Sequence, residues 1–121
     1  MSWKQTASWQ EKVFKKDAVR VAAALNAAKI ACTLEYPIKR EGEYNRDGKQ
    51  KFYSVDILLK DDRFERVGIE MEGQGSASAD DLKRDELIQS QGIILLHFPN
   101  KTKAQPIIDL LNSNFRKVSD L

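Results

Sequence analysis

The sequence predicts an α/β protein in which a mixed central sheet is flanked by helices. Strand and helix patterns follow one another in the order helix, three strands, helix, strand, helix. A short polar turn separates the second and third strand patterns, which is typical of an antiparallel hairpin. The last strand pattern is a continuous apolar run, as expected for a strand that is covered on both faces. No repeats or linkers interrupt the chain, so we expect one domain over residues 1–121.

Composition bounds the classes of function. The chain has 20 basic and 18 acidic residues and a net charge of +2, which by itself does not indicate nucleic-acid binding. Any DNA-binding surface must therefore come from local segregation of charge. The single Cys32 cannot form a disulfide within the chain and fits a reducing compartment. No apolar run approaches the roughly 18 residues of a membrane span. We expect a soluble, cytoplasmic protein without a membrane partner.

The first element is predicted to be one amphipathic helix over residues 8–29. Ser8 and Glu11 have the spacing of a capping box, and apolar residues recur at helical spacing from residue 14 to residue 28. Basic residues spaced four apart form another face of this helix: Lys12, Lys16 and Arg20. This face is either solvated or a stripe that contacts phosphates.

The first strand is expected at residues 33–38, where Pro37 indicates an edge strand or a strand end. Residues 39–51 are highly charged and contain an Asp47-Gly48 turn signal, so we interpret them as a long hairpin loop. The basic side chains of this segment are candidates for DNA contacts, although charged hairpin tips often serve only solubility: Lys39, Arg40, Arg46, Lys49 and Lys51.

Carboxylates lie inside the next two predicted strands, residues 54–59 and 66–72. Alternation in the second strand places Glu70 and Glu72 on one face, about 7 Å apart. In an antiparallel hairpin Asp56 stands beside Glu70. Close carboxylates raise the pKa of at least one of them unless a cation lies between them. Oxygen donors, including the carbonyl of Met71, favour Mg²⁺ or Mn²⁺.

A second helix is predicted from Asp80 or Asp81 to about Gln91, followed by a buried strand over residues 93–98 and a last helix over residues 104–116. We expect the second helix to turn its apolar side chains inward: Leu82, Leu87 and Ile88. Its first turn contains Lys83 and Arg84. Either can reach the acidic strands, or remain an exposed charge or a salt-bridge partner of Asp80 and Asp85, and Arg84 is also a candidate for DNA contacts. His97 ends the buried strand, where it is a packed, hydrogen-bonded residue or a base.

The order of Asp56, a hairpin, Glu70-Met71-Glu72, a helix and a further strand resembles the PD-(D/E)XK restriction-endonuclease-like superfamily. Within it, the run "VDILL … VGIEMEG … DDLKRDELIQSQGIILLHF" is most similar to the small very-short-patch-repair-like domains. The similarity covers roughly residues 54–100. Glu72 stands where the superfamily usually has a lysine, and Ser76 stands where this branch commonly has a histidine.

The resemblance implies an αβββαβ core with an added C-terminal helix and the activity of a magnesium-dependent DNA endonuclease. It implies that Asp56 and Glu70 bind the metal, and that Glu72 completes the site or orients the attacking water. Lys83 or Gln74 then helps to neutralise the charge of the reacting phosphate. A glutamate of the first helix often approaches the metal in this superfamily, so Glu11 is either a further site residue or only a cap.

Two alternatives remain from the sequence. The departures at Glu72 and Ser76 fit a catalytically inactive nuclease-like fold that binds DNA or a protein. An unrelated α/β protein, whose acidic strand face binds calcium or faces solvent, is the other alternative. A domain of this size contacts little DNA alone, so we also expect a homodimer.

Overall fold

The computed structural model describes residues 15–73 and 78–118, and within them it has one four-stranded sheet and three helices. The elements, in chain order, are α2 (Lys16–Ala27), β1 (Cys32–Tyr44), β2 (Gln50–Leu59), β3 (Val67–Glu72), α3 (Ala79–Ser90), β4 (Ile94–Pro99) and α4 (Ala104–Asn114). The predicted mixed α/β class is therefore confirmed. No helix among these residues is both long enough and apolar enough to cross a bilayer.

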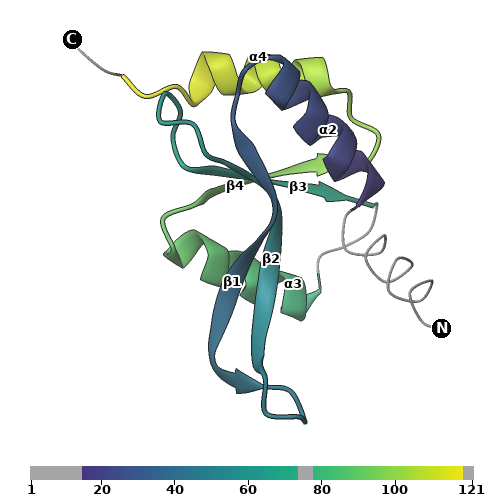
Figure 1. Ribbon diagram of the computed structural model, residues 1–121, viewed down its shortest axis with the longest axis vertical. Coiled ribbons are helices and arrows are strands. Elements are labelled where there is room, and N and C mark those ends of the chain that lie inside the picture. Colours follow the sequence, from purple (N-terminus) through teal and green to yellow (C-terminus); the bar gives the residue numbers. More distant parts are fainter. Residues whose placement is uncertain (1–14, 74–77, 119–121) are drawn as a thin grey trace, which may run out of the picture.

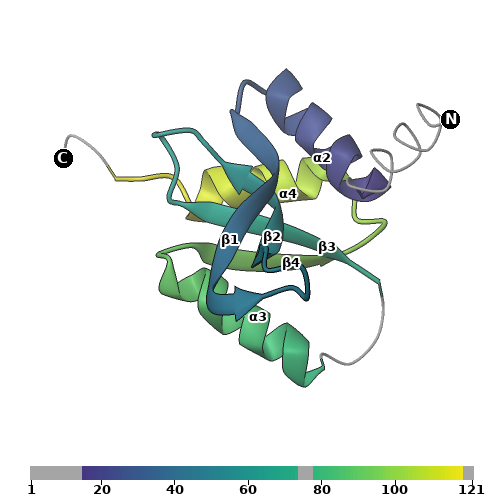
Figure 2. The ribbon, with the colours of Figure 1, turned by 60° about the horizontal axis from the view of Figure 1, so that its bottom comes forward.

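The strands are arranged in the order β1-β2-β3-β4. β1 pairs antiparallel with β2, and β2 pairs antiparallel with β3, as predicted for the hairpin. β4 runs parallel to β3, so α3 is the crossover between them. Helices α2 and α4 cover one face of the sheet, and α3 covers the other (Figures 1 and 2).

Each face of the sheet has its own apolar core. The larger core lies under α2 and α4 and includes Val21, Leu25, Ile57, Ile69, Ile107 and Leu111. The smaller core lies under α3 and includes Val55, Leu58, Ile88 and Ile93. The sheet between the two cores is therefore apolar on both sides, which is the environment in which the two buried acids of β2 and β3 must be held.

The first helix differs from the prediction of one helix over residues 8–29. The backbone of Lys15 is extended (φ −71°, ψ 137°), so α2 begins only at Lys16. It ends at Ala27 because Lys29 has a φ of 63°, which no helical residue adopts. Ser8, Glu11 and Lys12 lie outside the described residues.

Most of the segment predicted as a loop over residues 39–51 is strand. β1 continues to Tyr44 and β2 begins at Gln50, so the turn itself is short. The Gln50 side chain joins the strands at an irregular register, because its Nε2 donates to the carbonyl oxygens of Arg40 (2.6 Å) and Glu43 (2.8 Å). The turn signal is confirmed at Gly48, which has a φ of 82°. Residues 39–51, here called the arm, project from the body of the protein (Figure 1).

β4 contributes side chains to the cores on both faces of the sheet, as predicted, but the strand is less buried than a continuous apolar run leads one to expect. β4 is an edge strand, and the Ile94 side chain is 40% exposed although Ile93, just before the strand, is buried. An apolar run reports local hydrophobicity, which does not determine whether another strand pairs beyond it.

Helix α3 also departs from the expectation in two details. Its N-cap is Ser78, not Asp80 or Asp81, and Ser78 forms a capping box with Asp81. Leu82 is 57% exposed, whereas Ile88 is buried. Six residues separate these side chains, which places them about 120° apart around the helix.

Gly68 gives a first prediction about the packing of β3. A Cβ at this position would lie 2.8 Å from Val55 Cγ1 and 3.0 Å from Ile93 Cγ2, inside the core under α3. We expect Gly68→Ala to lower the free energy of unfolding by about 1–3 kcal/mol in a denaturant titration. Gly73→Ala is the matched control, because its Cβ would meet only Asn100 Nδ2 at 3.7 Å. Equal stabilities of the two variants would contradict this account.

Candidate active site

Two carboxylates replace the main-chain ladder where β2 and β3 separate. The last pairs are Leu58 with Gly68 and Ile57 with Ile69. Beyond them the Asp56 backbone N–H donates to Glu70 Oε2 at 2.7 Å, and the Met71 backbone N–H donates to Asp56 Oδ2 at 2.9 Å. Each acid thus occupies the gap between the strands and is held by a backbone donor of the opposite strand.

Both acids are withdrawn from water. Asp56 is 3% exposed and Glu70 is 1% exposed. Burial and the neighbouring Asp56 charge raise the pKa of Glu70 to about 7, although the Asp56 N–H, Arg84 and Lys15 oppose the shift. This is the raised pKa expected of carboxylates at close range. The alternative in which these strand acids face solvent does not describe Asp56 and Glu70.

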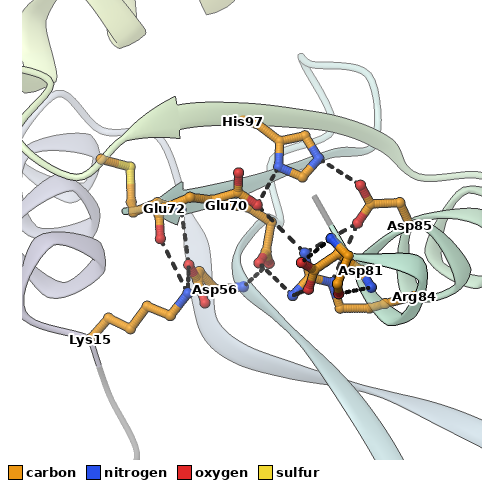
Figure 3. Close-up of polar contacts among 10 residues, drawn as sticks. Lys15, Asp56, Glu70, Glu72, Asp81, Arg84, Asp85 and His97 are labelled. Atoms are coloured by element: carbon orange, nitrogen blue, oxygen red, sulfur yellow. Dashed lines mark hydrogen bonds and ion pairs between the residues drawn. The ribbon is translucent and has the colours of Figure 1, made fainter. Parts of the chain in front are cut away.

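Lys15 supplies a cation to this pair. Its Nζ donates to Asp56 Oδ2 at 3.1 Å and to the Met71 carbonyl oxygen at 3.1 Å (Figure 3). Lys15 is the N-cap residue of α2, and its side chain reaches over the separated strands. Sequence reasoning missed Lys15, because its local pattern does not distinguish it from the adjacent, exposed Lys16.

Arg84 approaches the acids from the opposite face of the sheet. Its guanidinium nitrogens lie 4.0 Å from Glu70 Oε1 and 3.5 Å from Glu72 Oε1. They also lie 3.8 Å from Asp81 Oδ1 and 3.3 Å from Asp85 Oδ1 on its own helix. Lys83, the other predicted candidate, is exposed and lines a separate hollow beside the arm. Of these two neighbours in α3, Arg84 is the one that contacts the strand acids.

His97 connects Glu72 to α3. Its Nδ1 lies 2.7 Å from Glu72 Oε1, and its Nε2 lies 3.0 Å from Asp85 Oδ2 (Figure 3). Both ring nitrogens therefore lie within hydrogen-bond distance of a carboxylate oxygen. The hydrogen-bonded interpretation of His97 is therefore confirmed. Asp85 was not a predicted site residue, although it lies in the run DDLKRDEL on which the family resemblance partly depends.

Glu35 is a further carboxylate that sequence reasoning missed. It lies opposite Asp56, between the pairs Leu34 with Ile57 and Tyr36 with Val55. Its φ of 50° is in the left-handed region, which is costly for a residue other than glycine. Burial raises the pKa of Glu35, a hydrogen bond with Ser54 lowers it, and the Asp56 charge raises it further.

The predicted DNA-binding residues that the structure describes lie on α2, in the arm and, for Arg84, on α3. Arg20 already forms hydrogen bonds within the protein. Its Nη2 lies 3.1 Å from Asp17 Oδ1, and it donates to the backbone carbonyl oxygens of Asn100 (3.1 Å) and Thr102 (2.8 Å). Lys16, in contrast, is exposed on α2.

In the arm, Arg40 pairs with Glu43 at 2.8 Å and stacks 4.2 Å from the Tyr53 ring centre. Lys39 lies 3.7 Å from Glu41, and both side chains are exposed. Within residues 15–73 and 78–118, no ion pair involves Arg46, Lys49 or Lys51. Asp47, also in the arm, forms no ion pair within the described residues either, so these four side chains together leave an excess of positive charge on the arm.

The donors at the separated strands fit a magnesium or manganese ion. The Lys15 ammonium shows that Asp56 Oδ2 and the Met71 carbonyl converge on one cation. Asp56 and Met71 thus present a carboxylate oxygen and a carbonyl oxygen to this position, and Glu70 lies beside them, where it accepts the Asp56 N–H. Oxygen donors suit an ion that keeps several waters. In the part of the chain that the structure describes, His, Cys, Asp and Glu side chains form no ready group of three for a metal. Glu11, Gln74 and Ser76 lie outside that part.

No protein-family model, curated protein or solved structure matches this chain. The assignment of function therefore depends on the residues of the site.

The raised pKa of Glu70 predicts how stability depends on pH without metal. A carboxyl whose folded pKa exceeds its unfolded pKa stabilises the protein below the unfolded value, and this contribution is lost as pH rises through the folded value. The window here is pH 4.5 to about 7. A shift of this size corresponds to about 3 kcal/mol.

We expect the free energy of unfolding of the wild type in chelator to fall between pH 5 and pH 8. Glu70→Gln should lose most of this slope, because the amide does not ionise. The control Glu86→Gln, at an exposed position of α3, should keep it. Parallel pH profiles of the wild type and Glu70→Gln in chemical denaturation would refute the assignment.

Proposed function

We propose that this protein is a divalent-metal-dependent DNA endonuclease of the PD-(D/E)XK type. The observation that supports this proposal best is the pair of buried carboxylates, Asp56 and Glu70, where β2 and β3 separate. Burying two acids together is unfavourable unless they serve a cation or a reaction. The Met71 carbonyl oxygen and Asp56 Oδ2 both face the Lys15 ammonium, so these two oxygens have a common target.

In this proposal Asp56, Glu70 and the Met71 carbonyl hold Mg²⁺ or Mn²⁺. A bound ion supplies a water of lowered pKa and stabilises the leaving oxygen of the phosphodiester. Glu70 is then ionised, because the charge of the ion outweighs the burial that raises its pKa.

The residues around this pair bind and orient the other groups. Glu72 is 40% exposed, so its carboxylate lies where water reaches it and can accept a proton from the attacking water. His97 and Arg84 fix its orientation. Arg84 presents planar donors that suit phosphate oxygens, so it neutralises charge that develops on the reacting phosphate. In this proposal Arg84, and not the exposed Lys83, neutralises that charge.

The arm provides a DNA-binding surface continuous with the site. A two-stranded ribbon fits the major groove of DNA, and basic side chains bind its phosphates. β2 runs from the arm directly to Asp56, and Lys51 is five residues away, or about 17 Å along the strand. A duplex held at the carboxylates therefore passes the positive charges of Arg46, Lys49 and Lys51.

Cleavage tests the catalytic part of the proposal. We expect Asp56→Asn and Glu70→Gln to lower magnesium-dependent nicking of a supercoiled plasmid by at least about 100-fold, since each removes a proposed ligand. Asp62→Asn removes an exposed acid from the β2–β3 turn and should cleave like the wild type. Undiminished cleavage by both site variants would contradict the assignment.

A second candidate function is a catalytically silent nuclease-like fold that binds DNA. The observation that favours it is the compensation of the site acids without a metal, by Lys15 on one face of the sheet and by Arg84 and His97 on the other. This candidate would show salt-sensitive DNA binding and no magnesium-dependent nicking by the wild type.

DNA binding itself tests the arm under either function. We expect the triple variant Arg46→Ala, Lys49→Ala and Lys51→Ala to weaken duplex binding and to reduce the slope of log affinity against log salt by about 3 if each side chain contacts a phosphate.

The matched control removes the same charge elsewhere: Lys101→Ala, Lys103→Ala and Lys117→Ala. All three control side chains are exposed. It should keep the wild-type slope in fluorescence anisotropy. If both triple variants lose the same amount of the slope of log affinity against log salt, DNA binding depends on the net charge of the protein and not on the arm.

A further inference from the structure

The ammonium of Lys15 occupies the position on which two proposed metal ligands converge. Nζ is 3.1 Å from Asp56 Oδ2 and 3.1 Å from the Met71 carbonyl oxygen. These atoms come from strands distant in sequence, 41 and 56 residues from Lys15. The contact therefore exists only because the fold brings the start of α2 over the separated strands (Figure 3).

We propose that Lys15 competes with the divalent cation for this position and thereby sets the metal affinity of the site. The proposal rests on the proposed function, since it requires that Asp56, Glu70 and Met71 bind a metal. The new element is a residue that opposes metal binding. When the divalent ion binds, it replaces the Lys15 ammonium, which is the monovalent cation of the metal-free site.

Electrostatics makes the two occupants mutually exclusive. An ammonium and a divalent ion that share the same two oxygen atoms would lie within a few ångströms of one another, where like charges in a partly buried site repel strongly. Metal binding consequently includes the displacement of Nζ, and the free energy of the Lys15 contacts is subtracted from that of metal binding.

The Lys15 side chain can be displaced from the acids, whereas the Arg84 side chain is held in place. The Lys15 side chain is 49% exposed, so Nζ can move into water on its flexible four-carbon stem. Arg84 is only 21% exposed and lies near four carboxylates. Only the lysine therefore acts as an exchangeable counter-ion, and the arginine remains beside Glu70 and Glu72 in both states.

The test compares Lys15→Met with Lys16→Met, which removes the adjacent exposed lysine. Binding of Mn²⁺ alone is measured by calorimetry, and the melting temperature is measured in chelator and in Mn²⁺. We expect Lys15→Met to bind Mn²⁺ at least tenfold more tightly than the wild type. It should also melt lower in chelator, because Asp56 loses its cation, and gain more melting temperature from Mn²⁺. Lys16→Met should match the wild type.

Further variants show that the effect arises from charge at this site. Lys15→Arg keeps a cation and should keep the weak affinity of the wild type. The double variant Lys15→Met with Asp56→Asn should lose the gain. Lys15→Gln, which is uncharged but polar, replaces the methionine variant if that protein does not fold, and the same tenfold gain is expected of it.

Two outcomes would overturn the inference in distinguishable ways. If the wild type and Lys15→Met bind Mn²⁺ equally, the metal site stands and the competition by Lys15 does not. If neither protein binds Mn²⁺ or changes its melting temperature, the metal site of the proposed function fails and the competition fails with it.

Discussion

The need to compensate two buried carboxylates governs the arrangement of this protein. Asp56 and Glu70 lie in a sheet that is apolar on both faces, where an isolated charge is very unfavourable. Each acid accepts a hydrogen bond from a backbone N–H of the opposite strand, in a region where β2 and β3 no longer pair. The separation of β2 and β3 is thus a direct consequence of the side chains that the strands contain.

The helices supply the remaining compensation, one cation from each face. α2 begins at Lys16 because Lys15 is extended and reaches Asp56, and α3 brings Arg84 toward Glu70 and Glu72. These contacts also join elements that share few other polar interactions. Removing a single cation leaves a buried charge unpaired, which costs far more than the pair contributes when intact. The geometry of the site and the stability of the fold therefore depend on the same few groups.

The same groups explain how a charged site can persist without a ligand. An exposed, flexible lysine holds the place of a cation, while a less exposed arginine and a histidine fix the neighbouring Glu72. Glu35, in a strained backbone conformation opposite Asp56, adds to the negative potential of the region. Such strain persists only where the surrounding structure enforces it, and it is frequent at functional sites.

Local pattern determined the types of the elements, the β2–β3 hairpin, the Asp47-Gly48 turn and the neighbourhood of Asp56 and Glu70, because alternation and turn chemistry act over a few residues. Tertiary structure alone decided that Lys15 and not Lys16 contacts Asp56, that Arg84 and not Lys83 reaches Glu70, and that His97 joins Glu72 to Asp85. It also placed the apolar β4 at an edge and extended the charged arm as strand. These outcomes depend on contacts between residues far apart in the chain, and no local pattern encodes which of two adjacent cations will meet a distant acid.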